Sequence, residues 1–220
     1  MKKTLTIAAA LFTITFPLTA QNWSVGIHSG PFVFGDFVER KVRIITVLPS
    51  EPITMTLSAE TSAGFSADIQ RDFSERWGVR LEGTFTRAHI QLKEEGDESF
   101  TFDSGELEVA TFMLPIVFRI NPKGTFRFHV MGGPAYAMYE FQPPAHSGPI
   151  PIESRTKNEW GAALGGGVGW WISDRFAVEG TISDIVTTSP FDRDEFQDVP
   201  GYTIPKPHNV HTTVGVRWKF

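Results

Sequence analysis

The sequence has no cysteine among its 220 residues. A disulfide framework, a thiol nucleophile and a cysteine-ligated metal site are therefore excluded. An excess of basic residues is also lacking, since 20 Lys and Arg stand against 25 Asp and Glu. This balance speaks against nucleic acid as a partner, because nucleic-acid binding needs a basic surface.

Long apolar runs are missing as well. A helix needs about 20 apolar residues to cross a bilayer, and no stretch of the chain comes near that length. Residues 1–20 instead have the parts of a secretory signal: Lys2 and Lys3, an uncharged run, and a small residue, Ala20, before Gln21. We expect a cleavable signal peptide at residues 1–20 and one mature domain at residues 21–220, with 18 basic and 25 acidic residues and a net charge of −7.

The last stretch, residues 208–220, alternates between apolar and polar side chains. Strand side chains point alternately to opposite faces, so this segment has one apolar and one wet face. It is longer than the roughly 5 to 6 residues of common soluble strands and closer to the about 9 to 11 that a tilted strand needs to cross a bilayer. The apolar face holds the even positions Val210, Thr212, Val214, Val216, Trp218 and Phe220.

This segment resembles the closing strand of bacterial outer-membrane β-barrels, which typically ends in Phe with hydrophobic residues at every second position before it. The resemblance implies that Val214, Val216, Trp218 and Phe220 form the signal read by the barrel-assembly machinery.

Seven further segments show the same alternation, although it is weak in each. They are residues 23–33, 53–70, 77–86, 104–120, 126–138, 160–172 and 176–186. The connections between them alternate between long and short, which is the outer-membrane arrangement with short turns and both termini in the periplasm. We therefore predict an all-β fold: an eight-stranded antiparallel up-and-down transmembrane β-barrel, similar to the small OmpA-, OmpX- and OmpW-like barrels and located in the outer membrane. A mean hydropathy of −0.11 fits a barrel with one apolar face per strand.

Two segments depart from the simple pattern. Leu107 and Val109 lie in the opposite phase to Phe112, which indicates either a bulge near Ala110 or a strand top clear of the lipid. Residues 41–48 also have strand character. Because a ninth wall strand would put the termini on opposite sides, we interpret them as an extension of the first strand after a bend near Gly35.

A soluble lipocalin, with the apolar face inside, is the alternative barrel. The polar face consists mostly of Gly, Ala, Ser and Thr with few charges, which suits a narrow lumen better than a water-facing surface. Aromatic residues also gather beside the short turns and chain ends, as in an interfacial girdle. The predicted girdle comprises Trp23, Trp77, Trp170, Trp171 and Phe176.

The polar face predicts the contents of the lumen. Buried charges need partners, so we expect these residues to form a filled core, with a switchable gate or narrow ion path as the alternative. The predicted lumen charge network is Glu60, Arg80, Glu82, Arg127, Glu179, Arg217, Lys219, His28, His129 and His211.

Catalysis is the third class of function considered. Some small barrels modify lipid A with a His, a Ser and an acid near the outer rim, and the candidates here are His89, His146, Ser147 and Glu153, none at a family spacing. The acidic runs fit no EF-hand. We therefore expect no enzyme, cofactor or metal, and predict a structural or surface-interaction role with outer-membrane lipid and lipopolysaccharide as partners. The alternatives are a narrow pore or transporter for small or hydrophobic solutes and, further behind, a lipid A-modifying enzyme; the sequence does not indicate an extracellular partner.

Overall fold

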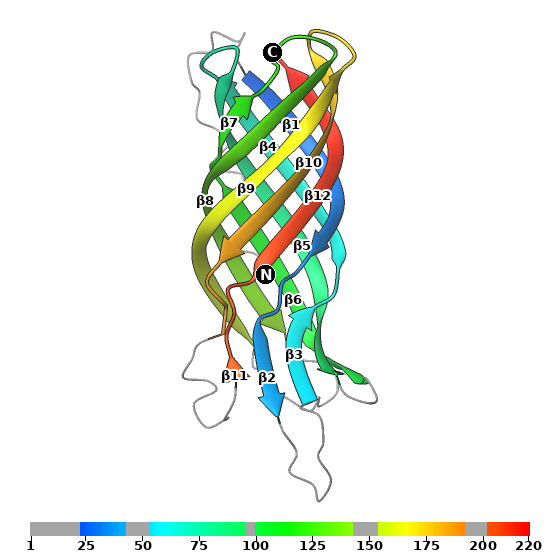
Figure 1. Cartoon of the computed structure of the whole chain (residues 1–220). Helices are drawn as coiled ribbons and strands as arrows, with labels where there is room; N and C mark the ends of the chain where they lie inside the picture. The colour runs from blue at the N-terminus through cyan, green and yellow to red at the C-terminus, as the bar shows by residue number, and fades with distance from the viewer. Residues whose placement is uncertain (1–22, 43–52, 96–99, 143–153, 192–201) are drawn as a thin grey trace, which may run out of the picture.

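The computed structural model describes residues 23–42, 53–95, 100–142, 154–191 and 202–220 (Figure 1). The signal peptide predicted at residues 1–20 therefore lies outside the described residues and stays a prediction. All regular structure in these ranges is β: β1 Trp23–Val33, β2 Val38–Val42, β3 Ile53–Ala59, β4 Ser62–Asp72, β5 Trp77–Glu95, β6 Phe100–Met113, β7 Ile116–Arg119, β8 Phe126–Gln142, β9 Arg155–Trp171, β10 Phe176–Thr187, β11 Tyr202–Thr203 and β12 His208–Lys219.

The wall is a closed barrel of eight antiparallel strands, as predicted, with β6 and β7 forming one strand between them. Its order is β1, β4, β5, β6 with β7, β8, β9, β10 and β12, and β12 pairs with β1. The two ends of the described barrel meet, since Phe220 N donates a hydrogen bond of 2.9 Å to Trp23 O. Closure leaves no free edge around the wall.

The register fixes the width of this barrel. Following paired residues once around the wall from Trp23 leads back to β1 at Val33, ten residues further along; the path runs through Arg71, Val79, Ile116, Gly132, Leu164, Asp184 and Val210. Eight strands with this shear tilt by about 35–45° and leave an interior just wide enough for side chains.

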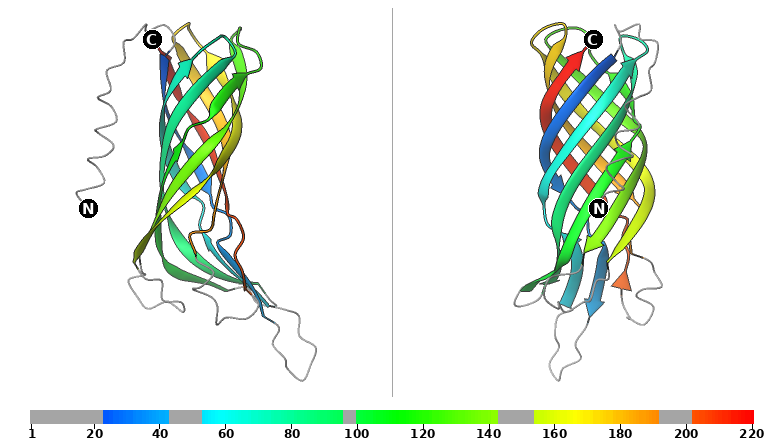
Figure 2. Two further views of the ribbon diagram at one scale, coloured as in Figure 1. Left: turned by 90° about the vertical axis from the view of Figure 1, so that its left-hand side faces the viewer. Right: turned by 180° about the vertical axis from the view of Figure 1, so that it is seen from behind.

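The barrel has two unlike ends. The short turns 73–76, 120–125 and 172–175 lie with Trp23 and Phe220 at one end, which we call the turn end. At the other, the loop end, β2, β3, β11 and the far parts of β5, β6 and β8 continue beyond the closed wall (Figure 2). We call this continuation the loop-end extension.

The ambiguous segment at residues 41–48 belongs in part to this extension. Among the described strands, β2 pairs with β3 and β11 alone, so it adds no ninth strand to the described wall. Residues 43–48 lie outside the described residues. The predicted strand at 53–70 is likewise divided, because it leaves the extension as β3 and enters the wall as β4 after Glu60 and Thr61.

The predicted strand at 104–120 contains two irregularities. Its regular pairing stops at Leu114 and Pro115, since proline has no N–H to donate, and resumes as β7. Of the two explanations for the phase change, the bulge near Ala110 is wrong and the strand top clear of the lipid remains: the register shifts between Ile90 and Gln91 of β5, opposite Gly105. Gly105 has a φ of 129°, a backbone conformation that glycine adopts at little cost.

The phase change at Leu107 and Val109 has a different cause. Both side chains point inward and are buried, whereas Phe112, further toward the turn end, points outward and is exposed. Apolar groups thus face outward along the barrel and inward in the loop-end extension. A strand that leaves the lipid must reverse its pattern in this way, because its outer face then meets water.

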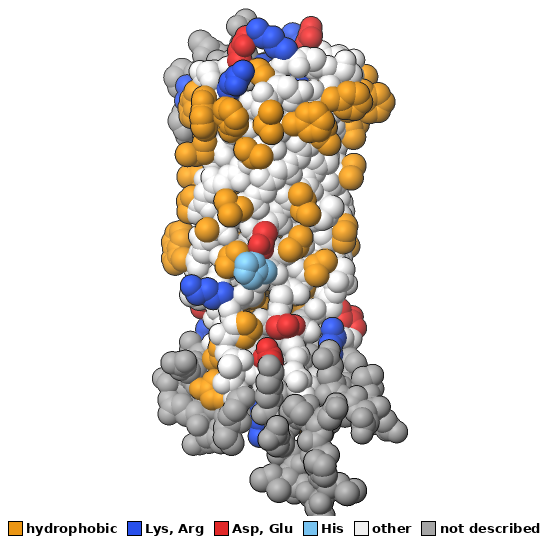
Figure 3. Space-filling model, in the orientation of Figure 1, with side chains coloured by type: hydrophobic (Ala, Val, Ile, Leu, Met, Phe, Trp, Pro, Cys, Tyr) orange, Lys and Arg blue, Asp and Glu red, His pale blue; other side chains and the backbone are white. Residues whose placement is uncertain are grey.

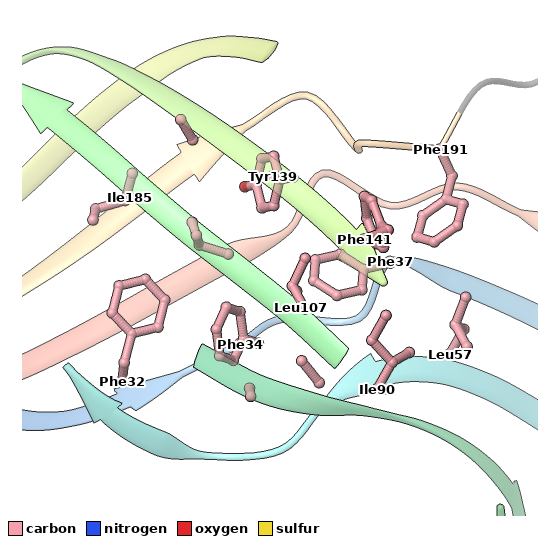
Figure 4. Close-up of a cluster of buried hydrophobic side chains, with 14 of the residues drawn as sticks. Phe32, Phe34, Phe37, Leu57, Ile90, Leu107, Tyr139, Phe141, Ile185 and Phe191 are labelled. Carbon is pink, nitrogen blue, oxygen red and sulfur yellow. The ribbon is translucent and has the colours of Figure 1, made fainter. Parts of the chain in front are cut away.

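The reversed pattern produces a hydrophobic core at the loop end, where aromatic side chains from distant strands converge (Figure 4). Phe37 lies edge-on to Tyr139, with ring centroids 6.3 Å apart, and also contacts Phe191. Further members are Phe32, Phe34, Leu57, Ile90, Leu107, Phe141 and Ile185. We call these residues the loop-end core.

The outer wall carries the opposite chemistry. Large apolar side chains are exposed on every strand of the wall. On the face shown in Figure 3, one band of them crosses the turn end. Soluble monomers rarely expose apolar patches above a few hundred Å², so this wall faces lipid, and the lipocalin alternative is excluded. The exposed side chains include Ile27, Phe65, Leu81, Phe85, Phe112, Ile116, Phe128, Val130, Leu164, Ile182, Val214 and Val216. In the described ranges, no helix is long and apolar enough to span a membrane.

Candidate functional site in the barrel lumen

Arg217 lies at the centre of a charge network in the turn-end half of the lumen. It comes from β12 and is 2% exposed. Its Nε donates to Glu179 Oε2 at 2.6 Å, and its Nη2 donates to Asp68 Oδ2 at 2.9 Å. Nη1 donates to Ser24 Oγ at 3.1 Å. One guanidinium thus joins β12 to β10, β4 and β1 across the lumen.

A second arginine completes the network from β5. Arg80 Nη2 donates to Glu179 Oε1 at 2.9 Å, and its Nε donates to Gln70 Oε1 at 3.0 Å. Glu82 Oε2 lies 4.0 Å from Arg80 Nη1. Two arginines therefore hold the carboxylates of Asp68 and Glu179 between them, which compensates the cost of burying each charge.

Histidine extends the network toward the loop end. His28 Nε2 lies 2.9 Å from Asp68 Oδ2, within hydrogen-bonding distance. Glycines make room for these large groups. A Cβ on Gly26 would collide with Asp68 and His28, and one on Gly64 would lie 2.7 Å from His211 Nε2. The small residues that the sequence places on the polar face thus form the space in which the charged side chains fit.

Side chains fill the lumen at two levels. Beyond the network, His211 is buried against Phe32, with ring centroids 5.2 Å apart, and Phe32 already belongs to the loop-end core. At the turn end a small pocket remains, lined by Gln70, Arg80, Val117, Arg119, Arg127, His129, Gly169, Trp171, Glu179 and Arg217. Side chains therefore close the barrel at two levels.

Most of the residues predicted for the lumen do lie there. His28, Arg80, Glu82, His129, Glu179, His211 and Arg217 are buried. Arg127 and Lys219 are half-buried near the ends of their strands at the turn end. Glu60 is a wrong prediction: it follows β3 in the loop-end extension, where it accepts a hydrogen bond from Gln91. The predicted strand bends at this point, so its parity does not continue into the lumen.

Sequence reasoning missed three members of the network: Asp68, Gln70 and Ser24. All three are buried and lie on the inward face of their strands. The alternation within residues 53–70 already placed Asp68 on the polar face, so parity alone could have found it. The hydrogen-bond partners of these residues, by contrast, depend on the shear of the closed barrel. Ser24, for example, accepts from Arg217, which is 193 residues away in the sequence.

The predicted girdle needs one correction. Trp77, Trp170 and Trp218 are about half exposed on the outer wall, and Trp23 and Phe176 are partly exposed at the same end. Trp171 instead lines the pocket, and the Arg127 guanidinium carbon lies 4.2 Å from its ring centroid. Trp170 and Trp171 are consecutive in one strand and so cannot share a face.

The predicted assembly signal lies on the lipid-facing side of β12. Val214, Val216, Trp218 and Phe220 are exposed on the outer wall at every second position. Their recognition during assembly stays a prediction. Of the catalytic candidates, His89 is exposed on β5, and His146, Ser147 and Glu153 lie outside the described residues.

Comparison with known proteins gives the fold but no close relative. No family model and no curated protein matches the sequence. Among solved structures, outer membrane protein OprG from Pseudomonas aeruginosa is 11% identical, with a TM-score of 0.53 over 91% of this chain and 97% of that one. Neisserial surface protein A is 8% identical, with a TM-score of 0.51 over 90% and 97%. Outer membrane protein AlkL is 13% identical, with a TM-score of 0.51 over 94% and 93%.

At these identities the likeness concerns the fold alone. Three further features are observed in this chain itself: the apolar outer wall, the charged lumen filled by side chains, and the short turns at the end where the described barrel closes. Together with the fold they lead to one conclusion: the chain is a small eight-stranded β-barrel of the outer membrane, with the fold seen in these solved bacterial barrels.

Proposed function

We propose that this protein is a non-enzymatic outer-membrane barrel with a structural or surface-interaction role. The observation that carries the proposal is the filled lumen: the Arg217 network occupies the turn-end half, and the loop-end core follows it. A barrel closed at two levels serves as a rigid anchor. The part it holds outside the lipid is the loop-end extension, whose own hydrophobic core keeps its strands in a defined arrangement.

Planar-bilayer conductance tests this proposal against the narrow-pore alternative. The purified protein should produce no current steps above those of protein-free bilayers, because neither filled level leaves a water path. A large-pore porin reconstituted in the same lipid serves as the positive control. Reproducible current steps whose size changes when Arg80 is replaced by Ala would contradict the structural role and support a gated ion path.

A lateral route for hydrophobic solutes would need an opening in the wall. The pairing between β1 and β12 is interrupted at Gly30 and Pro31, so this is the place in the wall where such an opening would lie. The backbones nevertheless stay close there, since a Cβ on Gly30 would collide with Thr212 O. This close approach supports a sealed seam, and the proposal therefore does not include lateral transport.

One acid–base pair lies on the outer wall. His208 Nδ1 and Asp184 Oδ2 are 2.8 Å apart, and both side chains are partly exposed. A hydrolase of the triad type would need a nucleophile hydrogen-bonded to this histidine, and within the described part of the chain His208 has no hydroxyl partner. We therefore propose no catalysis. Lipid A mass spectra should be identical in cells producing the wild type and His208→Ala; a mass shift found with the wild type alone would establish an enzyme.

The proposed partners follow from the same surfaces. The apolar wall fits outer-membrane lipid and the acyl chains of lipopolysaccharide, and the C-terminal strand fits the barrel-assembly machinery. The acidic runs at residues 94–98 and 192–198 extend into segments outside the described residues, so they add no contact to this proposal.

A further inference from the structure

The turn-end pocket has no role in the proposed function. It is open to solvent and is lined by four arginines, Arg80, Arg119, Arg127 and Arg217, against one carboxylate, Glu179. Two of these arginines, Arg80 and Arg217, are engaged with the network carboxylates. The other two lie nearer the mouth.

These two mouth arginines differ in their partners. Arg119 Nη2 donates to Asp72 Oδ1 at 2.5 Å, so its charge is compensated. Arg127 has no such partner: its Nε donates to Gly124 O at 3.2 Å, and no described carboxylate pairs with its guanidinium. Both Nη groups of Arg127 are therefore left to bind something else.

The position of Arg127 is held by an aromatic ring. Its guanidinium carbon lies 4.2 Å from the centroid of Trp171, which itself lines the pocket. Gly169, two residues before, leaves space on the same face, since a Cβ there would lie 3.3 Å from Trp171 Nε1. A stacked guanidinium loses little freedom on binding, which favours recognition of a planar or tetrahedral oxyanion.

A second observation points to a ligand in the same pocket. His129 is 7% exposed, lines the pocket, and has no hydrogen-bond partner for its Nε2 within the described residues. Among the described residues, the carboxylate oxygen that approaches that nitrogen within 4.0 Å is Glu179 Oε1, at 3.9 Å and beyond hydrogen-bonding distance. Buried polar atoms are normally satisfied, so an unpaired nitrogen in the same pocket as an arginine without a paired carboxylate marks a place for an additional group.

We propose that the turn-end mouth binds a small oxyanion of the phosphate type through Arg127, with His129 as the second polar contact. The fork of a guanidinium matches two phosphate oxygens. In the outer membrane this mouth faces the periplasm and the inner leaflet. The phosphate is therefore either free in the periplasm or part of a phospholipid head group, and the two sources share the same chemistry.

Calorimetric titration of inorganic phosphate into the purified barrel tests the site, with the protein in a phosphate-free maltoside detergent. The wild type should bind saturably, and Arg127→Gln should weaken binding about tenfold or more because a charge-assisted contact is removed. Arg175→Gln is the matched control, since Arg175 is exposed at the same end but does not line the pocket. Equal isotherms for the wild type and Arg127→Gln, or an equal loss in both variants, would overturn the site.

A second arm identifies the source of the phosphate. The titration is repeated with the barrel in bilayers of phosphatidylethanolamine and phosphatidylglycerol. If free phosphate is the ligand, the isotherm persists; if the head group fills the site, it disappears in bilayers but remains in detergent. Both results support an anion site. Failure of the site in detergent would leave the filled lumen, and with it the proposed function, unaffected.

Discussion

At the scale of single residues, the lumen shows which inferences parity allows and which it does not. Alternation placed Arg80, Glu179 and Arg217 on the inward face, and they are buried there. It did not show that both arginines share Glu179, because β5 comes to face the neighbouring strands β10 and β12 across the lumen only when the barrel closes. Contacts across a lumen depend on shear and tilt, which no single strand encodes.

Replacement of Arg217 by Ala tests how much the charge network contributes to the stability of the barrel. The change leaves two buried carboxylates, Asp68 and Glu179, with one arginine fewer, and removing one partner of a buried ion pair typically costs about 3–5 kcal/mol. We expect insertion to remain largely intact, since the lipid-facing side is unchanged, but the urea midpoint of the heat-modifiable barrel should fall. Arg175→Ala, at an exposed turn, is the control. An unchanged midpoint for Arg217→Ala would mean that the network adds no stability.

Replacement of Gly26 by Ala tests the space that the network occupies. A methyl group there would meet the Asp68 carboxylate and the His28 ring, so the free energy of unfolding should fall by about 1–3 kcal/mol, as for other overpacked cores. At Gly180 the nearest atom to an added Cβ is Thr213 O at 3.9 Å, so Gly180→Ala should be neutral or slightly stabilising. Equal effects at the two positions, measured by urea unfolding, would refute the role of Gly26 as a space for the network.

At the scale of elements, strands with uninterrupted alternation were the easiest to predict. β12, β9 and β10 match their predicted segments closely, although β9 starts at Arg155, before the predicted residue 160. Prediction was poorer where tertiary structure overrides the pattern. Pro115 divides one strand, and the register shifts opposite Gly105. Leu107 faces inward because it packs in the loop-end core and not against lipid. These features depend on neighbouring strands and on the position of the membrane, which lie outside any one segment.

Deletion of Phe220 tests the function of β12 as an assembly signal. Phe220 is exposed on the outer wall, and its backbone N–H donates to Trp23 O where the barrel closes. We expect the deletion to reduce the amount of membrane-inserted, heat-modifiable barrel several-fold, because it removes both the terminal aromatic and this closing bond. Phe220→Tyr keeps the bond and an aromatic ring and should assemble normally. Wild-type levels for the deletion would rule out this signal.

At the scale of the whole molecule, the reversal of polarity along the strands defines where the barrel meets the lipid. Trp170 and Trp160 are both exposed on the outer face of β9, ten residues apart. With a rise of about 3.3 Å per residue and a tilt near 40°, this separation is about 25 Å along the barrel axis, the height of the apolar band of outer-membrane barrels. The two tryptophans thus mark opposite interfaces, and Leu107 and Tyr139 lie in the part beyond the lipid, where apolar side chains face inward.

Fluorescence quenching by lipids brominated in their acyl chains tests this placement. In variants that retain a single tryptophan, the others being replaced by Phe, Trp160 and Trp170 should be quenched strongly because both rings are exposed on the lipid-facing wall. Trp171 should be quenched little, since its ring lines the turn-end pocket beside Arg127. The comparison between Trp170 and Trp171 carries its own control, because the two share one strand, one end of the barrel and nearly the same depth. Equal quenching of the pair would mean that Trp171 faces lipid, and the inward face of β9, the pocket and the phosphate site would all have to be abandoned together.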